Sequence, residues 1–268
     1  MSTAGTIVVG VDSTTSAGLA AGWATRLSDS VRLVHAAADG KVPDWLLGLA
    51  AATAATPEVV AGAGDPDAVA ALLRERARGA AMLVVGGHGR SAHPGLQAGD
   101  LAAGLAADPP CPVAVVHGLD AESPLPATGP VVVGTDGGPA GTAALDAAAD
   151  LARTLGADLV VVHAWTDVAP GAHRRTDDPE VLAEHGREVT EAARRRVAER
   201  QPGLAVETDP VQDTALRALL HRAERAQVLV VAPRVGTPPP AAAMQAGSTT
   251  RSLVAFAPCP VVVVPLPG

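Results

Sequence analysis

Aromatic residues are almost missing from this chain of 268 residues, which has one Phe, three Trp and no Tyr. Since 48% of the residues are still hydrophobic, Ala, Val and Leu must fill the cores, which favours close packing of helices on sheets. No apolar run approaches the roughly 20 residues that span a bilayer. The start also lacks the basic and apolar pattern of a secretory signal. We therefore expect a cytoplasmic protein without a membrane partner.

Positive charge is scarce as well. The chain has 19 Arg and a single Lys, Lys41, and its net charge is −8. A nucleic-acid-binding surface needs clustered positive charge. The densest basic run, residues 194–196, is interleaved with Glu191 and Glu199, which is typical of a solvated helix face. The composition argues against a nucleic-acid partner.

Only two cysteines are present, Cys111 and Cys259, each between two prolines and just before a Val-rich run. A zinc site would need more ligands, and a disulfide is not expected in a reducing compartment. We interpret both as small buried core residues.

The chain states one pattern twice. Residues 8–12 recur as residues 132–136, and the Pro-Cys-Pro motif occurs once in each half. The spacing is 124 residues from Asp12 to Asp136 but 148 from Cys111 to Cys259, so the second copy carries an insertion. We place copy one at residues 1–120 and copy two at residues 129–268, with a helical insertion at about 167–203. Such duplication predicts two copies of one domain.

Each copy alternates short Val-rich runs with helical patterns. Continuous apolar runs are typical of parallel strands buried on both faces, and Leu19, Trp23 and Leu27 lie four apart on one helical face. The fold class is therefore α/β: two tandem, doubly wound, parallel-sheet domains, Rossmann-like and five-stranded. The expected strands are residues 6–11, 31–35, 59–60, 82–85 and 113–117, then 131–134, 159–163, 205–208, 228–231 and 261–264. The expected helices are residues 17–27, 44–55, 66 to just before Gly79 and 100–107, then 143–155, 179 to just before Pro202, 215–225 and 248–255.

Because the copies share every strand, we expect a pseudo-two-fold axis between them, with the two last strands close together. These strands are Val-rich, and an uncovered Val-rich edge would invite association with other chains.

Copy one alone keeps a glycine-spaced loop between a strand and a helix. Two residues separate Gly86 from Gly89, and nine separate Gly89 from Gly99. Glycine lets the backbone approach a ligand closely, and N–H groups at a helix start bind phosphate oxygens. In copy two, Ala232 and Val235 replace the first two glycines and four prolines remove backbone donors. We therefore interpret the second loop as degenerate and expect at most one nucleotide per chain.

This spacing resembles that of the universal stress protein family, whose ATP-binding members carry G-x2-G-x9-G-(S/T) after the fourth strand. The resemblance covers both copies almost end to end. Further motifs that carry it are residues 8–12 with Trp23, residues 34–36, residues 64–66 and residues 257–261. Tandem members supply both halves of the family's usual dimer in one chain. The resemblance thus implies an intrachain pseudo-dimer, and leaves a homodimer of whole chains open.

The resemblance also implies an adenine-nucleotide site in copy one, with ATP as the cofactor. Asp12 would lie beside the ribose and adenine, Ala36 against the adenine, and the glycines around the phosphates. Asp100 stands where the family has Ser or Thr, so it would either engage phosphate through a metal ion such as Mg²⁺ or be an ordinary helix N-cap. The implied site consists of Gly10, Val11, Asp12, Ala36, Val85, Gly86, Gly89, Arg90, Gly99 and Asp100.

Three function classes remain open at this point. The first is a nucleotide-binding, stress-response regulator that acts by conformation or association. The second is a tandem scaffold that has lost nucleotide binding and works through partner surfaces. The third, a nucleotide-hydrolysing or nucleotidyl-transfer enzyme, lacks a recognisable catalytic group, so we expect a protein that is not an enzyme.

Overall fold

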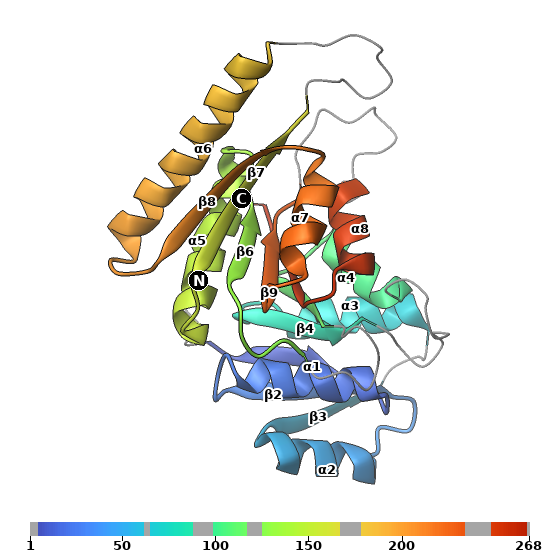
Figure 1. Cartoon of the computed structure of the whole chain (residues 1–268). Helices are drawn as coiled ribbons and strands as arrows, with labels where there is room; N and C mark the ends of the chain where they lie inside the picture. Colours follow the sequence, from blue (N-terminus) through green and yellow to red (C-terminus); the bar gives the residue numbers. More distant parts are fainter. Residues whose placement is uncertain are drawn as a thin grey trace.

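In the part of the chain that the structure describes, ten strands form one central sheet, with helices on both faces (Figure 1). The computed structural model describes residues 5–61, 65–87, 99–116, 125–166, 178–233 and 248–266, and of Asp100 and Ser248 only the backbone. The strands are β1 (Ile7–Gly10), β2 (Val31–Ala37), β3 (Thr56–Ala61), β4 (Met82–Gly86), β5 (Val113–Val116), β6 (Val131–Gly134), β7 (Leu159–Trp165), β8 (Val206–Gln212), β9 (Val228–Val231) and β10 (Val261–Val263). The helices are α1 (Thr15–Thr25), α2 (Asp44–Thr53), α3 (Pro66–Arg76), α4 (Asp100–Ala107), α5 (Pro139–Leu155), α6 (Pro179–Arg200), α7 (Ala215–Ala223) and α8 (Ser248–Phe256).

The strand order is β3-β2-β1-β4-β5-β10-β9-β6-β7-β8, so each copy contributes five parallel strands in the same order. The copies join where β5 pairs with β10 in antiparallel fashion, with Val113 opposite Val263 and Val115 opposite Val261. The predicted fold class and the predicted pairing of the last strands are confirmed.

Two hydrophobic cores run through both copies, one on each face of the sheet. The first is formed by residues of α1, α2, α5 and α6 packed on the sheet, and the second by residues of α3, α4, α7 and α8. Equivalent helices of the two copies therefore share a face, which places the pseudo-two-fold axis perpendicular to the sheet between β5 and β10. As a consequence, the carboxyl ends of the strands point to one edge of the sheet in copy one and to the opposite edge in copy two.

Several elements are longer than the sequence predicts. Helix α5 begins at Pro139 rather than at residue 143, because proline fits the first position of a helix, where its missing N–H is not needed. Strands β3 and β8 extend across Pro57 and Pro210. Both are the outermost strands of the sheet, where a proline can turn the side that lacks a donor away from the ladder.

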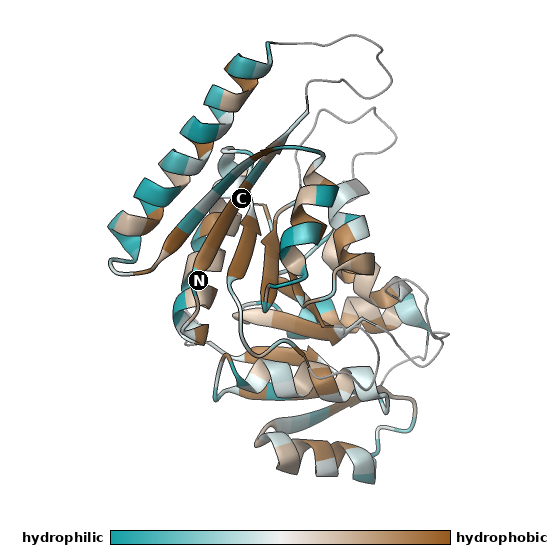
Figure 2. Ribbon diagram, in the orientation of Figure 1, coloured by the Kyte–Doolittle hydropathy of each residue, from teal (hydrophilic) through white to brown (hydrophobic). Residues whose placement is uncertain are grey.

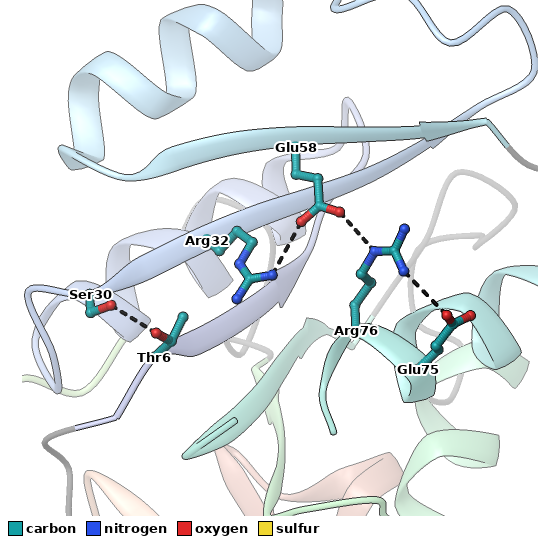
Figure 3. Close-up of polar contacts among 6 residues, drawn as sticks. All are labelled: Thr6, Ser30, Arg32, Glu58, Glu75 and Arg76. Carbon is teal, nitrogen blue, oxygen red and sulfur yellow. Dashed lines mark hydrogen bonds and ion pairs between the residues drawn. The ribbon is translucent and has the colours of Figure 1, made fainter. Parts of the chain in front are cut away.

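Arginines tie each outermost strand to the rest of its copy. In copy one, Glu58 of β3 lies between Arg32 of β2 and Arg76 of α3 (Figure 3), with Arg76 Nε 2.7 Å from Glu58 Oε1. In copy two, Arg222 of α7 makes the equivalent pair, with Nε 2.7 Å from Asp209 Oδ2 of β8. The duplication therefore extends to the ion pairs at both ends of the sheet.

The two copies differ most in the helix that follows their second strand. Helix α2 has 10 residues and α6 has 22. As the cap-and-proline motif predicts, α6 starts after Asp178, whose carboxylate accepts a hydrogen bond from Glu180 N at 2.9 Å. Its outer face is hydrophilic (Figure 2), with ion pairs such as Arg194–Glu191. No helix in the described ranges is long and apolar enough to cross a membrane.

The two cysteines are unpaired and buried, as predicted. Each lies just before a central strand, and burial raises the pKa of Cys111 to about 11 and that of Cys259 to about 12. Both thiols are therefore protonated at neutral pH.

We expect both thiols to resist alkylation in the folded protein. The thiolate is the nucleophile, and raised pKa values remove it at about pH 8, where a free cysteine of pKa about 8.5 is partly ionised. Mass spectrometry after iodoacetamide treatment at that pH should find no modification of the native protein and two modified thiols after unfolding in guanidinium. Rapid modification of either cysteine in the native protein would contradict the burial.

Candidate functional site

The carboxyl ends of β1 and β4 form the point in copy one where the strand order reverses. Strand β1 pairs with β2 on one side and with β4 on the other. In open α/β sheets, ligands bind at such a switch point, beyond the carboxyl ends of the strands. Among the predicted site residues, those that the structure brings to this edge are Gly10, Val11, Asp12, Ala36, Val85 and Gly86.

The base of the glycine loop reaches the same edge. Gly87 N donates to Val116 O at 2.9 Å, and Gly99 N donates to Gly87 O at 2.8 Å. Gly89 and Arg90 lie outside the described residues. Gly99 is the N-cap of α4, and Asp100 is the first residue of that helix. The expectation that Asp100 itself is the N-cap is therefore wrong by one position, because the backbone of Gly99 already accepts the first helical bond, from Ala103 N at 3.0 Å.

Asp12 organises the turn that leads from β1 into α1. Its Oδ1 accepts hydrogen bonds from Thr14 N at 3.0 Å and from Thr14 Oγ1 at 2.5 Å. Thr14 in turn caps α1 by accepting a bond from Ala17 N. In copy two, Asp136 Oδ1 accepts from Gly138 N at 3.0 Å. Since the copy with the altered loop keeps the same turn, this aspartate has a structural role in both copies.

The glycines at the strand ends have packing roles. A Cβ atom on Gly86 would lie 2.4 Å from Ser16 Oγ and 3.0 Å from the Ser16 carbonyl carbon, so the first turn of α1 rests directly on this strand end. A Cβ on Gly10 would lie 2.8 Å from Leu73 Cδ1 of α3. Val11 and Val85 bury their side chains in the two cores and offer only backbone atoms to the edge.

A crevice of about 360 Å³ opens at the carboxyl end of β2, beside the switch point. The His35 ring lies edge-on to Trp45, with ring centroids 4.9 Å apart and planes at 83°. Its Nδ1 donates to Val11 O at 2.9 Å, which fixes the imidazole at the end of β1. The crevice is lined by His35, Ala37, Asp39, Lys41, Val42, Pro43, Asp44 and Trp45.

Sequence reasoning missed most of this crevice. It singled out Ala36, but successive strand residues point to opposite faces, and the crevice is lined by the neighbours His35 and Ala37. Lys41 was considered only for its part in the charge composition. The one available signal was position, because Lys41 lies in the connection that follows the second strand and Trp45 is the second residue of the helix after it.

A second hollow, of about 390 Å³, lies in copy two between the ends of α5 and α6. It is next to Asp158 and Ala205, which precede β7 and β8, and so it is at the edge of the sheet opposite to the carboxyl ends of the copy-two strands. The described residues contain no cluster of three or more His, Cys, Asp or Glu side chains placed to hold a metal ion.

In copy two the equivalent strand ends carry different side chains. Ala232 follows β9 where Gly86 ends β4, and Ala140 stands at the position of Ser16. Pro233 follows directly and has no N–H to donate. Residues 234–247, the remainder of the second loop, lie outside the described residues.

We expect Gly86→Ala to destabilise the protein by roughly 1–3 kcal/mol without any ligand, because the new methyl group collides with Ser16. Urea unfolding followed by circular dichroism measures this change. The second change, Ser16→Ala, gives copy one the two alanines that copy two has at the equivalent positions, Ala140 and Ala232. It should recover on the order of 1 kcal/mol of the lost free energy of unfolding. Purely additive effects in this double-mutant cycle would contradict the packing role of Gly86.

Comparison with known proteins gives a consistent result. The sequence profile of the universal stress protein family matches residues 41–117 and 128–265. A universal stress protein of Mycobacterium tuberculosis is 30% identical over 260 residues, which cover 85% of this chain and 86% of that protein. Another from the same organism is 36% identical over 155 residues, or 57% of this chain and 51% of that protein. The crystal structure of a universal stress protein from Archaeoglobus fulgidus superposes with a TM-score of 0.68 at 16% identity and covers 98% of both chains.

Proposed function

Since this chain belongs to the universal stress protein family, we propose that copy one binds an adenine nucleotide and that the protein acts in the stress response through conformation or association. The proposal contains no catalytic step. The two buried, unpaired thiols suit a reducing compartment, so we place this activity in the cytoplasm.

The crevice at the end of β2 is the observation that carries the proposal. The crevice has a volume of about 360 Å³, and its aromatic lining distinguishes it from the hollow between α5 and α6. Trp45 and His35 supply flat rings beside which a base can pack, and Lys41 and Asp39 supply polar groups at its rim. The crevice adjoins the switch point, where a ligand of a doubly wound sheet binds.

From this crevice the phosphates would extend toward the glycine loop. We assign the phosphate contacts to backbone N–H groups between Gly86 and Gly99 and to the positive end of α4. The proposed site also includes Gly89 and Arg90, which lie outside the described residues. Gly10, Val11, Val85 and Ala36 form the backbone floor of the site, and Asp12 contacts the ribose.

One observation favours the alternative, a tandem scaffold without nucleotide. The Asp12 turn is repeated by Asp136, so its presence does not require a ligand.

ATP titration separates the two functions: we expect quenching of Trp45 fluorescence and one nucleotide per chain by calorimetry. If no heat or fluorescence change occurs, with or without Mg²⁺, the tandem scaffold is the function that remains. Two sites of similar affinity would contradict the assignment to copy one, and slow release of ADP would indicate an enzyme.

Asp100 should make ATP binding weak and dependent on Mg²⁺. Two unit charges ~5 Å apart at an effective dielectric constant of ~20 repel by roughly 3 kcal/mol, on the order of a hundredfold in affinity, and a bound metal ion offsets such repulsion. Calorimetry should therefore find tighter and less metal-dependent binding after Asp100→Ser.

A matched control is Asp67→Ser, in the first turn of α3, which should change neither the affinity nor its metal dependence. If Asp100→Ser behaves like this control while ATP still binds, the phosphates lie elsewhere than at the start of α4.

A further inference from the structure

We propose that Trp165 blocks the base crevice of copy two from within the chain and thereby confines nucleotide binding to copy one. The inference rests on the proposed function for its biological meaning. Its structural content, a crevice filled by the protein's own side chain, can be tested separately.

The equivalence of the two crevices follows from a pair of histidines. His35 Nδ1 donates to Val11 O at 2.9 Å, and His163 Nδ1 donates to Thr135 O at 2.9 Å. These bonds fix the same register of the second strand against the first in both copies. Two residues after each histidine, copy one has Ala37, which lines the open crevice, and copy two has Trp165.

Trp165 is packed closely into that position. A Cβ atom on Gly186 of α6 would lie 2.6 Å from Trp165 Cζ3 and 2.9 Å from Cε3, so only glycine lets the helix cross the indole. The ring centroids of Trp165 and His163 lie 6.3 Å apart, and the ring planes make an angle of 24°. Trp165 Nε1 is buried, and none of the described residues accepts a hydrogen bond from it, which indicates that shape rather than polar bonding holds the indole.

The greater length of α6 closes the crevice further. In copy one, the second residue of α2, Trp45, meets the edge of His35. In copy two, His185, in the second turn of α6, meets His163 in the same manner, with ring centroids 6.0 Å apart at 87°. One turn later, Val189 covers the strand-to-helix turn of copy two, because a Cβ on Gly137 would lie 3.3 Å from its methyl groups. Helix α6 thus covers, in copy two, the region equivalent to the one that remains open above β2 in copy one.

Removing the indole should open a site for a base but not for a triphosphate. The second loop has Ala232 and Pro233 where copy one has Gly86 and Gly87, and it offers fewer N–H donors. The ligand class for the opened crevice is therefore a flat, uncharged aromatic such as adenosine or indole.

The experiment is saturation-transfer NMR of adenosine on the whole chain, with and without excess ATP. In the wild-type protein, ATP should displace all bound adenosine, because both compete for copy one. In Trp165→Ala, an ATP-resistant adenosine signal should appear, and indole should raise the melting temperature of this variant but not that of the wild-type protein. The matched control Trp45→Ala should instead lose the ATP-sensitive signal without gaining a resistant one.

A variant without any ATP-resistant adenosine signal and without stabilisation by indole would overturn the inference, whatever copy one binds. Conversely, a wild-type protein that binds no adenosine, beside a Trp165→Ala variant that does, would refute the proposed function and keep this inference. If Trp165→Ala does not fold, Trp165→Leu shortens the side chain with a smaller loss of volume. On the wild-type protein labelled with 5-fluorotryptophan, adenosine should shift the Trp45 resonance only, and a shift of Trp165 would overturn the inference.

Discussion

The antiparallel pairing of β5 with β10 is the contact on which the rest of this molecule depends. The valines of both strands are completely buried, which requires a neighbour on each side and a helix layer on each face. Pairing supplies the missing neighbour to both strands at once, and α4 and α8 pack together beside it. A single copy would end in a Val-rich edge, the kind of edge that recruits other chains. Since both strands belong to one chain, the pairing does not depend on protein concentration.

This arrangement makes the structural role of each copy independent of any ligand site that it carries. Copy two must keep β9 and β10 in place to complete the sheet, but this structural role does not require an open crevice at the carboxyl end of β7. The carboxyl ends of the strands lie at opposite edges of the sheet in the two copies, because the copies are related by an axis perpendicular to it. The differences are accordingly local: Ala37 against Trp165, Ser16 with Gly86 against Ala140 with Ala232, and α2 against the longer α6.

Much of the fold could be predicted from the sequence, because strands buried on both faces read as unbroken Val and Leu runs and the duplication repeats them in order. The bounds of β6, β9 and α4 follow directly from such runs and from the glycine before α4. The outermost strands β3 and β8 were underestimated, since each contains a proline, and only the three-dimensional order shows that these strands have a free side. Domain limits and ligand roles stay predictions. The crevice was not predictable, because it depends on the size of one side chain, Ala37, and on how α2 lies over β2.

Two residues of the motif at the end of β1 have the same structural role in both copies. Asp12 and Gly10 resemble a binding motif, yet Asp136 and Gly134 make the same turn and the same close helix contact in copy two. Residues that make the same contacts in both copies have a structural role in the fold. Gly86 belongs to the proposed phosphate loop and also has a packing role, since the first turn of α1 occupies the space of its missing side chain. Under the proposed function, the residues that distinguish the binding copy from the other are therefore those with different volumes at equivalent positions, above all Ala37 and Trp165, and neither belongs to the motif that identifies the family.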